Sequence, residues 1–95
     1  MNNQEIIEKL EHEWESGFFA ILRMKGFDQE GFRRVESLLE CLNPNVEHMP
    51  QRLVALTWFI PLFMSWQEAP NISVEEYRNH VDRMEALVMK GLGVP

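Results

Sequence analysis

The feature that most constrains this chain is an apolar stretch at residues 53–66, which reads LVALTWFIPLFMSW. A helix made of these residues is apolar on nearly every side, so it cannot be a surface element of a water-soluble protein. The stretch is shorter than the roughly 20 apolar residues that span a bilayer, and Pro61 lies inside it. It therefore predicts a buried central helix at about residues 50–68, kinked near Thr57 because Pro61 cannot donate a hydrogen bond to that carbonyl.

Apolar residues recur at helical spacing on both sides of this stretch and predict three further helices. The first covers about residues 3–25 and has Gly17 inside its apolar stripe, where we expect close approach of the central helix. The second covers about residues 29–42, with Asp28 as its N-cap and Phe27 and Phe32 as a hydrophobic staple. Gly26 ends the helix before it.

The last helix has the clearest boundary signal. Ser73, followed by Glu76 three residues later, forms a capping box, and Gly91 and Gly93 mark the end of the helix. Val74 begins its predicted buried stripe. Together the four helices predict an all-α protein, a compact four-helix bundle in a single domain spanning residues 1–95.

The helical phase also assigns side chains to faces. On a continuous helix over residues 3–25, Phe19 falls on the side that faces water. On the central helix, Thr57, Pro61 and Ser65 form the least apolar side, which we expect nearest to solvent. Cys41 lies at the edge of its apolar stripe and is predicted to be a small packing residue.

The charge balance limits the class of partner. The net charge is −6, which argues against nucleic-acid binding and against binding to an anionic membrane surface. It suits a basic protein partner, because complementary fields steer encounter, and it also serves solubility. A single cysteine and a polar, acidic start without the pattern of an export signal predict a cytoplasmic protein.

Residues that could carry chemistry are scattered. Glu8 and His12 share a helix face but lie outside the apolar stripe, where a bundle-core metal site could not use them. No Ser, His and Asp set is linked by spacing, and there is no glycine-rich phosphate loop. We therefore predict no enzymatic activity, no cofactor and no metal.

The sequence favours a protein-interaction module. Its predicted surface combines acidic residues of the first helix with an exposed aromatic anchor. The predicted partner-binding residues are Glu8, Glu11, Glu15, Phe19 and Arg23. In size and acidity the chain is similar to bacterial immunity proteins, which neutralise a toxin, but this is a likeness of type without a shared motif.

Three large apolar residues of the central helix, Trp58, Leu62 and Trp66, belong neither to its best inward face nor to its polar side. They predict either a two-fold homodimer contact or an apolar pocket. The alternative function is a regulatory protein that binds a small apolar ligand inside the bundle, beside Thr57. That pocket would be lined by Trp58, Phe63, Met64 and Met84.

Overall fold

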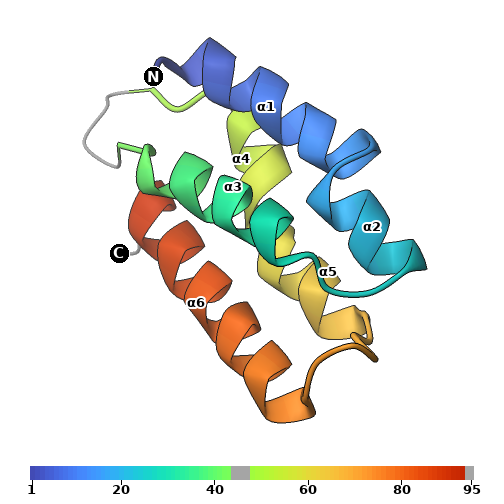
Figure 1. Ribbon diagram of the computed structural model, residues 1–95. Helices are drawn as coiled ribbons and strands as arrows, with labels where there is room; N and C mark the ends of the chain where they lie inside the picture. The colour runs from blue at the N-terminus through green and yellow to red at the C-terminus, as the bar shows by residue number, and fades with distance from the viewer. Residues whose placement is uncertain (44–47, 94–95) are drawn as a thin grey trace.

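The computed structural model describes residues 1–43 and 48–93, and Figure 1 shows how the helices are arranged. The described residues form six α-helices: α1 (Asn3–Glu15), α2 (Phe18–Met24), α3 (Gln29–Glu40), α4 (Gln51–Trp58), α5 (Ile60–Trp66) and α6 (Val74–Leu92). Two of the four predicted helices are broken once each, into α1–α2 and α4–α5. The chain is an all-α four-helix bundle whose corners are α1–α2, α3, α4–α5 and α6.

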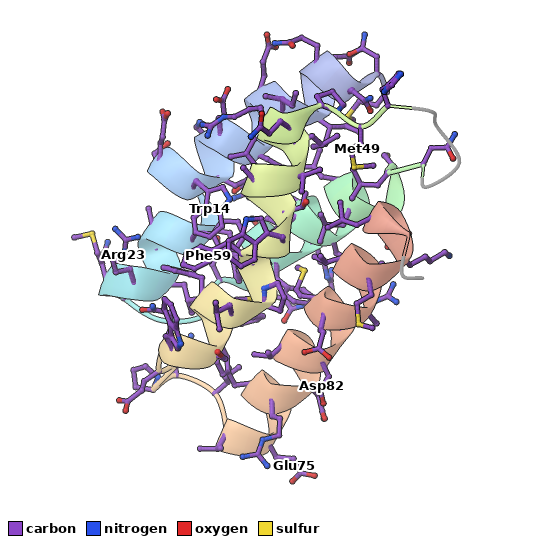
Figure 2. All side chains as sticks on the ribbon, turned by 180° about the vertical axis from the view of Figure 1, so that it is seen from behind. Trp14, Arg23, Met49, Phe59, Glu75 and Asp82 are labelled. Atoms are coloured by element: carbon purple, nitrogen blue, oxygen red, sulfur yellow. The ribbon has the colours of Figure 1, made fainter. Side chains whose placement is uncertain are left out.

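The apolar helix α4–α5 lies between α1 and α6. α4 contacts both of these helices, α5 packs along α6, and α3 bridges α1 and α6 on the other side of the core. Figure 2, which views the molecule from behind, places α4 and α5 in front of α3. Pro44, which stops a helix at the residue before it, also predicts a loop over residues 43–49, of which residues 44–47 lie outside the described residues. The described part of the chain contains no helix with the length and apolar content needed to cross a membrane.

The core draws on all four corners of the bundle. Its largest fully buried apolar side chains are Ile6, Leu10, Phe18, Phe19, Leu22, Val35, Leu39, Leu53, Ile60, Met64 and Met84. Burying an aliphatic or aromatic side chain of this size contributes about 1.5–3 kcal/mol each. The fold is therefore held mainly by contacts between helices, because α2, α4 and α5 are too short to be stable alone.

The first break changes the face on which Phe19 lies. Gly17 has φ −97° and ψ −133°, outside the helical region, and α2 begins anew at Phe18. The prediction that Phe19 faces water is wrong: its side chain is 0% exposed and stacks on Trp14 with ring centroids 4.0 Å apart. The predicted face assumed one unbroken helix, and a single non-helical residue resets the helical phase.

The sequence suggested that the central helix approaches closely at Gly17. The atoms nearest to a side chain placed there belong instead to Glu13. A side chain at Gly17 would overlap the carboxyl group of Glu13, one turn earlier in the chain. The space beside this glycine is therefore filled by Glu13, and the glycine is needed for that carboxylate to lie where it does.

The second break lies at Phe59 (φ −78°, ψ −15°), two residues beyond the predicted kink at Thr57. The expectation that Thr57 lies near solvent is wrong, because the residue is fully buried. Its hydroxyl donates to the carbonyl oxygens of Leu53 and Val54, at 2.9 and 3.1 Å. Satisfied within its own helix, the hydroxyl can be buried at little cost.

Most local boundary predictions are confirmed. Gly26 follows α2 with a φ of 123°, a conformation that favours glycine. Asp28 precedes α3 but makes no side-chain cap bond, while the Phe27 and Phe32 rings pack at 5.5 Å. The Ser73 hydroxyl accepts from the Glu76 backbone N–H at 3.1 Å.

Two side-chain predictions at the ends of helices and one half of a boundary prediction are wrong. Val74, in the first turn of α6, is 76% exposed and does not belong to the buried stripe. Cys41 is exposed instead of packed. Gly91 lies inside α6 against Leu42, and the helix ends at Gly93, which has a φ of 78°.

Candidate interaction surface

The largest exposed apolar side chains that lie together on one helical face are those of α4 and α5. Trp58, Leu62 and Trp66 follow one another at four-residue spacing and are 52%, 40% and 63% exposed. We call these three residues the tryptophan stripe. The sequence predicted that these three side chains are not fully covered within the chain, and this prediction is confirmed. What covers the stripe remains a prediction.

The two indoles of the stripe rest on a common support, Phe59. The Phe59 ring meets Trp58 edge-to-face at 5.5 Å and Trp66 edge-to-face at 5.4 Å. Such pairs contribute about 0.5–1.5 kcal/mol each beyond the area they bury. The tryptophans are thus held in place before any partner arrives, which lowers the entropy lost on binding.

Trp14 of α1 packs against Phe59. Its ring lies 6.0 Å from Phe59, and its indole N–H donates to the Leu56 carbonyl at 3.0 Å. Figure 2 shows Trp14 of α1 and Phe59 next to each other. This hydrogen bond joins α1 to α4 and holds Trp14 in place against Phe59.

Arg23 completes this side of the molecule. It projects from α2 (Figure 2) and places its guanidinium carbon 5.4 Å from the centre of the Phe63 ring. Phe63 in turn lies 6.2 Å from Phe59. Arg23 is therefore connected to Phe59, which supports the stripe, only through the buried Phe63 ring.

The structure does not bring the other predicted partner-binding residues together. Phe19 is in the core and cannot serve as a surface anchor. Glu11 forms an ion pair with Arg52 of α4 at 2.8 Å, while Glu8 lines a groove on the α3 side of α1. Glu15 is exposed. The acidic residues of α1 therefore point to different flanks of the helix.

Sequence reasoning missed an ion pair at the joint between α1 and α2, in which the Glu13 carboxylate is buried and the Arg34 side chain is half exposed. Glu13 Oε2 accepts from Arg34 Nε at 2.8 Å, and Oε1 accepts from Arg34 Nη2 at 3.2 Å. Oε1 also accepts from the Phe18 N–H at 2.9 Å, which caps the first turn of α2. The position of Glu13 in the apolar stripe, between Leu10 and Gly17, was the available signal.

Burial and hydrogen bonding act in opposite directions on the Glu13 carboxyl. Burial by itself raises its pKa, but the hydrogen bonds from Arg34 and from the Phe18 N–H, together with the arginine charge, outweigh this effect. The pKa of Glu13 therefore lies below its ordinary value, and the pKa of Arg34 is raised by the same pair. The pair is a charged structural clamp at neutral pH.

A groove of about 650 Å³ runs between α1 and α3 next to this clamp. Its lining consists of Met1, Glu8, Lys9, His12, Glu13, Arg33, Arg34, Ser37 and Leu38. Lys9 and Arg33 make no ion pair within the described residues. The groove thus presents two cations outside any ion pair, together with the carboxylate of Glu8, in a chain that is acidic as a whole.

A second groove of about 640 Å³ lies between α5 and α6. Its lining consists of Ser65, Gln67, Glu68, Ala69, Pro70, Ile72, Val74, Tyr77, Arg78 and Val81. The Tyr77 hydroxyl donates to the Met64 carbonyl at 2.6 Å, and burial raises the pKa of Tyr77 to about 12. Its charged side chains, Glu68 and Arg78, are of opposite sign.

Comparisons of the chain with protein-family models, curated proteins and solved structures returned no match. Within residues 1–43 and 48–93, no three His, Cys, Asp or Glu side chains group closely enough to hold a metal ion. The features of this molecule that point to a function are therefore the tryptophan stripe and the two grooves.

Proposed function

We propose that this protein is a non-enzymatic protein-interaction module and that its contact surface is the tryptophan stripe. The observation that carries the proposal is the exposure of Trp58, Leu62 and Trp66 on one face, with both indoles held in place by Phe59. Exposed apolar patches of this kind mark interaction sites, and tryptophan is enriched among the residues that dominate binding.

Charge and size support a more specific version of the proposal, an inhibitor or immunity-type protein of the cytoplasm. A net charge of −6 speeds the encounter with a basic protein. The stripe itself carries no charge, so it supplies the desolvated centre of the contact, while the net negative charge of the whole chain supplies the steering. Another copy of the chain is the second protein partner that this surface fits.

We expect the stripe to account for most of the binding energy. Replacing both Trp58 and Trp66 with alanine should weaken partner binding at least about 30-fold, the cost of losing one hot spot or more. The measurement is affinity capture from the native host with the wild-type and the double variant, followed by titration of the captured protein.

The control for this experiment is Val74→Ala, which removes another exposed apolar side chain from α6. It should capture the same partner as the wild-type chain. If the double tryptophan variant retains the partner at unchanged affinity, the stripe is not the contact surface.

The alternative, a regulatory protein that binds a small ligand, is supported at a different place from the one expected. Trp58 is on the surface while Met64 and Met84 are fully buried, so these residues do not line one internal pocket. The groove between α1 and α3 instead offers the free cations Lys9 and Arg33. It suits a small organic anion with an apolar body.

Phenyl phosphate is a suitable probe for this groove. Titration followed by NMR should shift backbone amides of residues 8–13 and 33–38, and Arg33→Gln should weaken binding about tenfold, as expected for a lost charged hydrogen bond. Arg78→Gln is the control, because Arg78 lines the similarly sized groove between α5 and α6. Equal weakening by both variants, or shifts spread over the whole chain, would rule out a site in this groove.

A further inference from the structure

The three residues of the tryptophan stripe are spaced symmetrically about Leu62. Trp58 precedes it by four residues and Trp66 follows it by four, so the stripe reads the same from either end. A two-fold axis through Leu62 would place an antiparallel copy of the helix with equivalent side chains opposite one another. Ala55, one turn before Trp58, is exposed and small, which leaves room for the chain that follows Trp66 of the partner subunit.

The surroundings of the stripe carry little charge. Residues 53–67 contain no Asp, Glu, Lys or Arg. Arg52, just before this segment, is neutralised by Glu11 at 2.8 Å. Two copies would therefore meet without like charges directly opposed at the axis. The remaining repulsion between two chains of net charge −6 acts at longer range, where salt screens it over about 10 Å at 0.1 M.

We propose that the partner of the tryptophan stripe is a second copy of this chain, packed antiparallel with Leu62 on a two-fold axis. Leu62 meets Leu62 of the partner subunit, and Trp58 packs against Trp66 of the partner subunit at each end of the contact. This inference rests on the proposed function, because it assigns the partner of the same surface.

The size of the contact determines how tight the dimer is. A tryptophan buries about 150–250 Å² at most, so the stripe supplies only part of the roughly 800 Å² per partner of a standard stable interface. We therefore expect a reversible dimer with a dissociation constant on the order of micromolar. Raising the salt concentration should tighten it, whereas a complex with a basic partner would weaken.

Cysteine cross-linking tests the register directly. In a Cys41→Ser background, Leu62→Cys should form a covalent dimer with a short bis-maleimide at protein concentrations of tens of micromolar, on the order of the expected dissociation constant. Trp58→Cys and Trp66→Cys should cross-link poorly alone and efficiently when mixed. Val74→Cys, on α6 and more exposed than any residue of the stripe, should stay monomeric. Failure of Leu62→Cys, or equal yields from the single and mixed tryptophan variants, would overturn this arrangement.

Mass measurements distinguish failure of the dimer from failure of the proposed function. Light scattering over a hundredfold concentration range should show wild-type mass rising towards a dimer, and Leu62→Asp should raise the dissociation constant at least about tenfold by opposing two carboxylates. Circular dichroism checks that this variant remains folded. A wild-type chain that stays monomeric overturns the dimer, and the Trp58 and Trp66 capture experiment then decides separately whether the stripe binds another protein.

Discussion

Replacing Phe19 with alanine is expected to lower the free energy of unfolding by about 3–5 kcal/mol, the usual cost of deleting a buried phenyl ring. The side chain is 0% exposed, stacks on Trp14 at 4.0 Å and meets Phe18 and Phe63 edge-to-face at 5.1 and 5.9 Å. Its removal opens a cavity where α1, α2 and α5 meet. Urea unfolding followed by circular dichroism measures the loss.

Trp58→Ala is the matched control, because it deletes a larger ring that is 52% exposed. It should cost less, about 1–2 kcal/mol in the isolated subunit, because about half of the removed side chain is already hydrated and the edge-to-face contact with Phe59 is lost. A Phe19→Ala variant as stable as Trp58→Ala would mean that Phe19 lies at the surface, as one continuous helix over residues 3–25 predicts.

Loss of the Glu13 carboxylate is the second large effect. Glu13→Ala is expected to destabilise the fold by about 2–3 kcal/mol, because it leaves the Phe18 N–H without its cap and Arg34 without its partner. The expected cost is below that of a fully buried pair, because the Arg34 side chain is 49% exposed and can be rehydrated. Glu15→Ala removes an exposed carboxylate from the same helix and should change stability by less than about 0.5 kcal/mol.

The pH dependence of stability gives an independent test of this pair. Burial raises the pKa of Glu13. The hydrogen bonds from Arg34 and Phe18 and the arginine charge lower this pKa by more than burial raises it, so the folded pKa lies below the unfolded one. The stabilisation is therefore complete above the unfolded value of about 4.5 and is lost as the pH falls through the folded pKa.

A comparison of the wild-type chain with Glu13→Gln should show this loss. The difference in unfolding free energy is expected to be constant at neutral pH and to shrink below about pH 4.5. Glu15→Gln removes the same charge from an exposed position and should show no comparable change. If the Glu13→Gln difference is independent of pH, the ionised pair does not contribute to stability.

Local sequence signals determined where several helices begin and end. The bond from the Glu76 N–H to the Ser73 hydroxyl, the Phe27–Phe32 contact and the positive φ of Gly26 involve residues close together in the chain. Such interactions depend on residue type and spacing, so the four-helix class and most boundaries could be predicted. The exposure of Trp58, Leu62 and Trp66 could also be anticipated, because a helix that is apolar all round has more apolar surface than its neighbours can cover.

Only the tertiary structure decided which acidic and aromatic residues of the first helix are available for binding. At the break at Gly17, Glu13 caps the first turn of α2 and pairs with Arg34, which is 21 residues away in the chain. The sequence determined that Phe19 is apolar and that Glu13 lies in an apolar stripe. The direction of each side chain depended on the helical phase after Gly17, and the contacts at that break include a long-range ion pair that periodicity cannot detect.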